Sequence, residues 1–283
     1  MATFGFGGGS GGTEFLTMLP PPHDAVNDWD NTKPYNQQSS NTPQIFRDAM
    51  SVREEVYGEQ GVPLEAEFDE DDRRSFHWVV YASVATTSSP PPDSLRSDTN
   101  SNTAADDARR SSSTAQRLPV GTIRLVPPPH KANPYKVKDK HPDADPPGDA
   151  SRKDSLPKEP YIKLGRLAVL APYRRLHLSG LLVNAALQYA TEHPENIRPP
   201  PSPTRMERVQ QIGKELEEAI LWRGLAMVHA QVSVERLWVK YGFSEELRDE
   251  NGNVEVQKEE RWWEEGIEHM GMWKRLKLDS GRL

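Results

Sequence analysis

Apolar and polar positions along the chain change period several times, and the changes separate helices from strands. After Thr42-Pro43, a pair typical of a helix start, apolar residues recur at helical spacing from Ile45 to Val56. Three later segments are also predicted to be helical. They are residues 179–191, a segment carrying Val209, Ile212, Leu216 and Ile220, and residues 232–240.

Shorter runs rich in aromatic and β-branched residues predict strands. These runs are residues 76–82, 120–126, 161–170, 224–230 and 267–276. One helix precedes the first three strands, and helices alternate with the remaining strands. This order is typical of an α/β (α+β) domain in which helices flank a mixed sheet.

Polar segments without periodicity lie between these elements, and we expect them to be disordered inserts. They cover residues 86–117, 127–158 and 194–205, approximately. Residues 1–40 are Pro- and Gly-rich and predict a disordered tail, in which the Gly/Ser run of residues 1–15 resembles a linker. Residues 41–283 are then expected to form a single domain.

Composition narrows the class of function. The net charge of −7 argues against a nucleic-acid partner, because phosphate neutralisation requires a basic face, and it suits a cationic substrate such as an amine. The absence of cysteine excludes a thiol nucleophile and a Cys-ligated zinc site, and we expect no metal. No apolar run is long enough for a membrane span, and the first residues lack the features of a signal peptide. We expect a cytoplasmic protein, with the nucleus as the alternative compartment.

The most informative stretch runs from Leu164 to Leu182. An apolar strand ends near Pro172, a basic loop with Arg174 and Arg175 follows, and an apolar helix begins at once. Free N–H groups at a helix N-terminus favour a bound anion, so this turn suits a pyrophosphate. The alternative is an ordinary strand-to-helix turn with two solvated arginines.

The same stretch resembles the coenzyme A-binding motif of GNAT-superfamily N-acetyltransferases, whose usual form is Arg/Gln-x-x-Gly-x-Gly/Ala. Arg174 matches the first position, whereas His177 and Ser179 stand where glycines are usual. Glycine permits close approach of the backbone to a ligand, so His177 would have to turn its ring away from the cofactor.

Three further stretches resemble the same superfamily and occur in the expected order. Residues 230–243 resemble its helix ending in Tyr-x-x-x-Gly-Phe. Residues 53–69 and 265–272 resemble the "Glu-Gln…Pro…Asp" and "Asp-Gly-Ile-x-His-x-x-Met" segments of the ElaA-like branch. The resemblance therefore extends over residues 42–276.

The resemblance implies a GNAT fold with a central, mixed, splayed sheet, and direct attack of a primary amine on the thioester of acetyl-coenzyme A. Pantetheine would pair with an exposed strand edge as an added strand does. The residues implied to bind the cofactor are Leu167, Ala168, Val169, Arg174, Arg175, Leu176, His177, Leu178, Ser179, Gly180, Gln231 and Trp238.

The resemblance also implies where the catalytic groups lie. The family's thiolate-protonating tyrosine stands four residues before the glycine of Gly-Phe, which is Trp238 here; Tyr241 could substitute or could only pack against the sheet. Glu59 is our first candidate for the general base. The expected acceptor-binding residues are Glu59, Gln60, Asp69 and His269.

The acceptor is the least determined part of the function. We expect a primary amine on a small molecule such as an amino sugar or polyamine. The alternatives are a protein lysine or N-terminus, and a coenzyme A-binding sensor without transfer activity. A homodimer is a further option that the sequence leaves open.

Overall fold

The computed structural model describes residues 3–4, 15–85, 115–136, 157, 159–198 and 222–278. The predicted helix that carries Val209 to Ile220 lies outside the described residues, as do most positions of the three inserts. None of the described helices is long and apolar enough to cross a membrane.

One sheet forms the centre of the domain, with the strand order β1-β2-β3-β4-β5-β6-β10-β9. Neighbouring strands pair antiparallel except β5 and β6, which are parallel, so the sheet is mixed as predicted. Its strands are β1 (Thr3–Phe4), β2 (Phe15–Leu19), β3 (Phe76–Ala85), β4 (Ala115–Val126), β5 (Ile162–Val169), β6 (Leu225–Gln231), β9 (Trp262–Glu264) and β10 (Ile267–Arg275).

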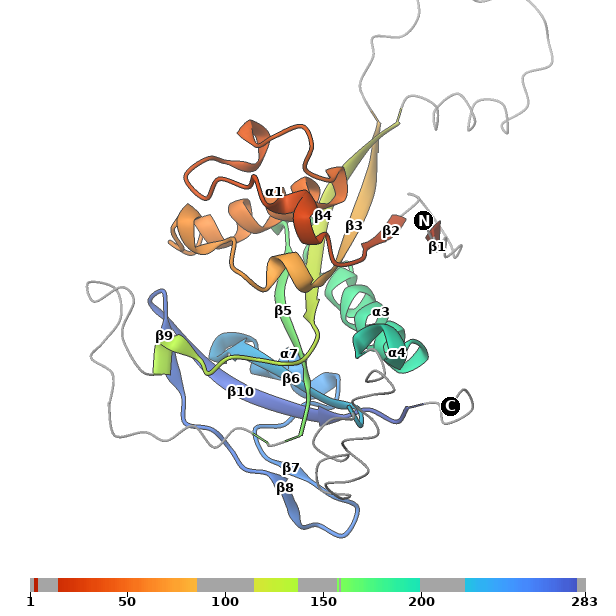
Figure 1. Cartoon of the computed structure of the whole chain (residues 1–283), viewed down its shortest axis with the longest axis vertical. Helices are drawn as coiled ribbons and strands as arrows, with labels where there is room; N and C mark the ends of the chain where they lie inside the picture. Colours follow the sequence, from red (N-terminus) through yellow and green to blue (C-terminus); the bar gives the residue numbers. More distant parts are fainter. Residues whose placement is uncertain are drawn as a thin grey trace, which may run out of the picture.

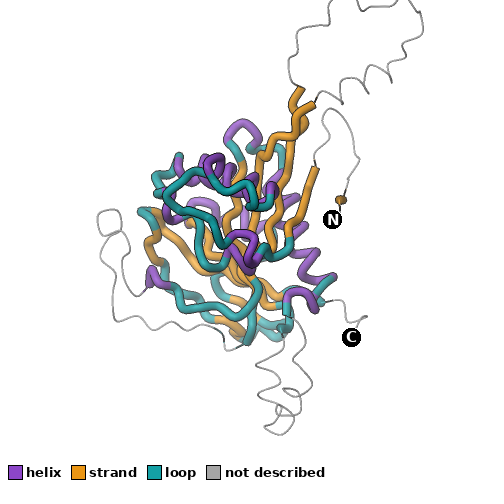
Figure 2. Tube along the Cα trace, turned by 45° about the horizontal axis from the view of Figure 1, so that its top comes forward, coloured by secondary structure: helices purple, strands orange, loops and turns teal. Residues whose placement is uncertain are grey.

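Helices cover both faces of the sheet (Figures 1 and 2). Ala49 of α1 packs against Val79 of β3, whereas Tyr189 of α3 contacts Phe76 and Trp78. Successive residues of a strand point to opposite faces, so α1 and α3 lie on opposite sides. The α-helices are α1 (Gln44–Gly58), α3 (Leu178–Glu192), α4 (Pro194–Ile197) and α7 (Glu235–Lys240).

Short 3-10 helices connect these elements. They are η1 (His23–Val26), η2 (Tyr35–Gln37), η3 (Leu64–Ala66), η4 (Asp72–Arg74), η6 (Pro134–Lys136), η7 (Ala171–Tyr173) and η8 (Val232–Val234). The helix predicted over 232–240 is thus one turn of η8 followed by α7. A separate hairpin is formed by β7 (Leu247–Arg248) and β8 (Val254–Val256), and its turn contains the Asn-Gly pair at 251–252, a pair typical of hairpin turns.

The predicted tail is wrong from residue 15 onward. β2 pairs with β3 from Phe15 to Leu19, and Trp29 packs edge-on against Phe46 of α1 at a centroid distance of 5.2 Å. Trp29 also stacks on Phe68 at 5.9 Å. Residues 15–40 therefore extend the sheet and cover α1, because their few apolar side chains are buried against β3 and α1.

The predicted insert boundaries are also too wide. β4 begins at Ala115, within the first expected insert. Residues 127–136 continue from β4 along the central cavity, and Asn133 among them is buried. Pro194–Ile197 forms α4, and Ile197 is buried in the core. Sequence alone predicts disorder for these short segments because they adjoin proline-rich and polar stretches.

The sheet splays between β5 and β6. These two strands pair only over Ile162–Leu164 and Ala226–Val228, and the remainder of each strand has no partner across the gap. In Figure 1, β3, β4 and β5 run up the picture whereas β6 and β10 cross it. The splayed, mixed sheet expected from the GNAT resemblance is therefore present.

Candidate functional site

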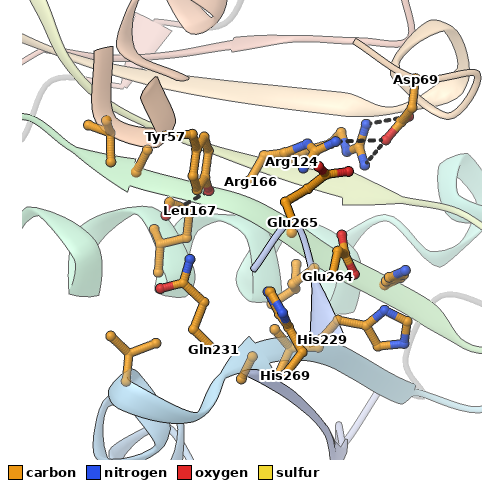
Figure 3. A pocket seen from close by; sticks show the side chains of 18 of the residues that line it. Tyr57, Asp69, Arg124, Arg166, Leu167, His229, Gln231, Glu264, Glu265 and His269 are labelled. Carbon is orange, nitrogen blue, oxygen red and sulfur yellow. Dashed lines mark hydrogen bonds and ion pairs between the residues drawn. The ribbon is translucent and has the colours of Figure 1, made fainter. Parts of the chain in front are cut away.

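A cavity of about 1790 Å³ fills the gap left by the splay. Its walls are the unpaired halves of β5 and β6, the loop that leads into α3, the end of α1 with the following loop, residues 130–135, and the β9–β10 turn (Figure 3). Segments far apart in the sequence thus meet at one place, which makes this cavity the candidate site.

A β-bulge in β5 opens the strand edge toward the cavity. Thr122 of β4 pairs with Ala168, and Arg124 pairs with Gly165, so β5 holds one residue more than β4 over this interval. Arg166, at the bulge, has a φ of 52°, a backbone conformation that a non-glycine residue rarely adopts. Such bulges re-aim backbone groups beside active sites, and this one lies where the splay begins.

The predicted pantetheine edge, Leu167 to Val169, lines the cavity. Its inner side pairs with β4, whereas its outer side faces the gap without a strand partner among the described residues. The Leu167 carbonyl accepts a hydrogen bond from the Tyr57 hydroxyl at 3.2 Å (Figure 3). The Val169 carbonyl accepts one from Arg174 Nε at 3.0 Å. These contacts fix the edge in position from both ends.

The loop between β5 and α3 contains two left-handed residues, one of them at a position where the motif usually has glycine. Arg175 has a φ of 69° and His177, the N-cap of α3, a φ of 60°, both in the left-handed region. Left-handed geometry costs a non-glycine residue about 1–2 kcal/mol, so it persists only where the surroundings impose it. The left-handed residues Arg175 and His177 therefore lead the chain directly into the N-terminus of α3.

Most predicted cofactor-binding residues of this loop line the cavity. Arg174, Arg175, His177, Leu178 and Ser179 do so. Two others do not. The side chain of Leu176 is 54% exposed outside the cavity, because the left-handed residues on either side turn it outward, and Gly180 is buried against Tyr241.

The two residues considered as the general acid lie at different depths. Trp238 is only 3% exposed and packs edge-on against Phe243 at 5.3 Å. The Tyr241 hydroxyl lies against the first turn of α3, so close that a Cβ on Gly180 would be 2.4 Å from its oxygen. Tyr241 therefore lies beside the start of α3, at the end of the cavity toward which β5 and β6 splay apart.

Replacing Tyr241 by phenylalanine is expected to lower kcat by less than about threefold, because the ring keeps its packing and a positioned proton donor would contribute about a hundredfold or more. Steady-state kinetics of Tyr241→Phe with acetyl-coenzyme A as the varied substrate measures this. A hundredfold loss of kcat in a folded variant would instead assign thiolate protonation to Tyr241.

Glu59, Gln60 and Gln231 lie together where α1 ends and β6 ends. Gln231 Nε2 donates to Gln60 Oε1 at 2.7 Å, which links the two elements at the mouth of the gap. The Glu59 carboxylate is half exposed and forms an ion pair with Arg174 at 3.5 Å. This carboxylate faces solvent and already has the Arg174 guanidinium as its partner, so the geometry does not favour Glu59 as the general base.

Asp69 is enclosed by arginines rather than open to a cationic substrate. Arg124 binds its two carboxylate oxygens at 2.7 and 2.9 Å, and Arg166 binds one of them at 3.2 Å (Figure 3). Burial opposes ionisation, but the two guanidinium groups outweigh it and hold the pKa of Asp69 well below its usual range. Its charge is already compensated, so the expected role in attracting an ammonium group is not supported.

His269 faces the cavity from β10. Its neighbour Met270 points into the opposite, apolar core, and strand alternation turns His269 toward the gap. The ring Nδ1 lies 2.8 Å from the Ile267 carbonyl oxygen. A carbonyl only accepts, so Nδ1 carries the proton and Nε2 of the neutral ring is an acceptor. Trp262 packs between His269 and His229, at centroid distances of 6.1 and 4.6 Å.

The β9–β10 turn adds two carboxylates that the sequence analysis did not single out. Glu265 and Gly266 have φ values of 52° and 74°, as a two-residue hairpin turn requires. The turn carries Glu264 and Glu265 into the cavity (Figure 3). There Tyr135 donates a hydrogen bond to Glu265 at 2.7 Å. The Glu265-Gly266 pair is the sequence signal for this turn. The turn is missed from sequence alone because these residues are assigned there to the segment that begins the last strand.

Among the described residues, no group of histidine and acidic side chains is placed to hold a metal ion. The cavity is lined by a strand edge and a left-handed turn with two arginines at one end, and by histidines, carboxylates and cationic side chains at the other.

No protein-family model and no curated protein sequence matches this chain significantly. Solved structures do. Escherichia coli ElaA is 13% identical, with 92% of this chain and 98% of that chain covered and a TM-score of 0.41. An acyl-CoA N-acyltransferase from Pseudomonas aeruginosa is 14% identical, with 93% and 99% covered and a TM-score of 0.40. At this level of similarity, the activity has to be argued from the site.

Proposed function

We propose that this protein is an acyl-coenzyme A-dependent N-acyltransferase that transfers an acetyl group to a primary amine. The observation that carries the proposal is one continuous cavity that joins three features: an unpaired strand edge, a left-handed turn at a helix N-terminus, and a chamber lined by ionisable side chains. Each feature matches one part of the chemistry: pantetheine, pyrophosphate and amine.

Coenzyme A would bind along the first two features. Its pyrophosphate would lie at the start of α3, where free N–H groups, the helix dipole and the Arg174 and Arg175 charges favour an anion. Its pantetheine amides would pair with the outer edge of Leu167–Val169. Gln231 and Trp238 line the other side of the same channel.

The reaction proceeds by direct attack. The amine nitrogen forms a bond to the thioester carbonyl carbon, the carbon–sulfur bond breaks, and the sulfur leaves as a thiolate that takes a proton. Before attack the ammonium group must lose a proton, and His269 Nε2 is the acceptor that the geometry favours for it. Holding both substrates in the cavity supplies the remaining acceleration through proximity.

The acceptor half of the cavity favours a small molecule over a protein chain. Residues 130–135 and the β9–β10 turn border it, and Tyr135 links the two through its bond to Glu265. His130 stacks on Tyr161 at 4.4 Å and adds to the aromatic rim. A rim with aromatic side chains on two sides suits a compact amine.

The proposal predicts that acetyl-coenzyme A raises the melting temperature, because it binds the native state only. Replacing Arg174 and Arg175 together by glutamate should abolish this rise while leaving the unliganded melting temperature near that of the wild type, since both side chains are exposed. Thermal-shift titration measures the binding, and thiol release from acetyl-coenzyme A against a panel of amines measures the transfer.

Arg236→Glu is a matched control, since this exposed arginine of α7 is not among the cavity residues. It should keep the full cofactor-induced rise. An undiminished rise in the double variant would remove the cofactor from the α3 turn, and a lack of thiol release with every amine would remove the transfer activity.

A further inference from the structure

Lys163 is a cationic side chain in the cavity wall that has no counterion among the described residues. Its neighbours on β5, Ile162 and Leu164, are buried in the core beneath α3, and strand alternation turns Lys163 to the opposite face, where it lines the cavity. It forms no hydrogen bond or ion pair with the part of the chain that the structure describes. Burial lowers the pKa of its ammonium group, and Glu264 is the carboxylate that opposes this most.

The charges behind Lys163 are already balanced. Three buried or half-buried arginines face three carboxylates: Arg53, Arg124 and Arg166 against Glu67, Asp69 and Asp72. This network neither needs nor neutralises another cation. In this wall of the cavity, as far as the structure describes it, Lys163 is a cation outside the ion-paired network, and Glu264 is the carboxylate whose charge acts on it most.

Hydrogen-bond donors without acceptors lie in the same wall. Arg124 Nε and Arg166 Nε are buried and have no hydrogen-bond partner among the described residues, and Arg124 is only 6% exposed. Buried donors are normally satisfied, so these two show that the arginine network is incompletely hydrogen-bonded, as does the buried acceptor Glu67 Oε1. Glu264 and Glu265 also line the cavity (Figure 3), and no ion pair joins Lys163 to Glu264 among the described residues.

We propose that the acceptor amine also carries a carboxylate, which Lys163 binds, while the amine nitrogen lies toward Glu264 and His269. This assignment rests on the proposed transferase function and narrows its substrate to amino acid-like zwitterions. One uncompensated ammonium matches one carboxylate, whereas a phosphate ester would bring a second charge with no partner. A polyamine or an amino sugar would leave Lys163 facing another cation or a neutral group.

The test compares acceptors that differ only in the carboxylate. Glycine, β-alanine and 4-aminobutyrate, the protein amino acids, and the amide of each are titrated calorimetrically into the protein saturated with coenzyme A. We expect at least one acid to bind about tenfold or more tightly than its amide, as a charge-assisted contact in a desolvated site requires. In Lys163→Met this preference should fall to about one.

Lys33→Met is the matched control. Lys33 is half exposed, pairs with Asp30 at 2.8 Å and lies outside the cavity, so its removal takes away one charge without touching the site. The preference for the acid should persist in this variant. Lys163→Arg should restore part of it, because the charge returns with a different shape.

Stability separates a binding role from a structural one. Removing an unpaired, partly buried ammonium relieves its desolvation, so Lys163→Met should melt at the same temperature as the wild type or higher. A structural lysine would instead lower the melting temperature when replaced. If Lys163→Met does not fold, that result supports a structural role for Lys163. The binding of acids and amides is then compared in Lys163→Gln instead.

The proposal falls if acids and amides bind equally across the panel, or if the preference survives in Lys163→Met. Thiol release, measured on the same panel, reports separately on the transferase function. Acids that bind through Lys163 without any thiol release would overturn the transfer and keep the carboxylate site. Release that is fastest with amines lacking a carboxylate would keep the transfer and overturn the site.

Discussion

Replacing His269 by glutamine is expected to lower kcat by about a hundredfold or more, the contribution of a positioned general base. The reason lies in the ring orientation. The Ile267 carbonyl fixes the proton on Nδ1, so Nε2 is the acceptor that faces the cavity. Glutamine can keep a hydrogen bond to that carbonyl but cannot take up a proton. The measurement is single-turnover acetyl transfer at saturating acetyl-coenzyme A.

Comparison with a second variant, at a carboxylate, separates proton removal from simple positioning, because His269→Gln keeps the positioning bond to Ile267 and loses only the proton acceptor. Glu59→Gln is the comparison variant, and we expect a change in kcat of only a few-fold, since Glu59 is half exposed and paired with Arg174. A hundredfold loss at Glu59 with a mild effect at His269 would restore the assignment made from sequence.

The regular elements of the fold could be predicted because their period is strong. Ile45 to Val56, Phe76 to Ala82 and Leu225 to Ala230 carry unbroken apolar patterns, and all three lie in the elements expected of them. The strand Phe15–Leu19 could not be predicted because it is short and adjoins a Gly/Ser-rich run. Its strand identity comes from pairing with β3, which is a tertiary property.

The cofactor end of the site was more predictable than the acceptor end. A strand, a basic loop and a helix follow one another in the sequence, so local order implied the turn at Arg174 to Ser179. Lys163, Glu264 and His269 come from three different strands, and only the splay brings them to one cavity. The environment of Asp69 could not be predicted either, because its two arginine partners lie 55 and 97 residues away in sequence.

Replacing Arg53 by methionine is expected to destabilise the fold strongly. Arg53 is 1% exposed and joins Asp72 at 2.8 Å to Glu67 at 3.4 Å. Its loss leaves Glu67 buried without a cation and weakens the group that holds Asp72. Removing one partner of a buried ion network costs about 3–5 kcal/mol. The melting temperature should fall by on the order of 10 °C for a domain of this size.

Arg73→Met is the matched control from the same region. Arg73 pairs with Asp24 at 3.3 Å, but both side chains are exposed, so its removal should change the free energy of unfolding by less than about 1 kcal/mol. Adding Glu67→Gln to Arg53→Met should recover part of the loss, because the amide removes the uncompensated charge. Urea unfolding of the four proteins measures these differences. Equal losses for Arg53→Met and Arg73→Met would show that burial of the network contributes nothing to stability.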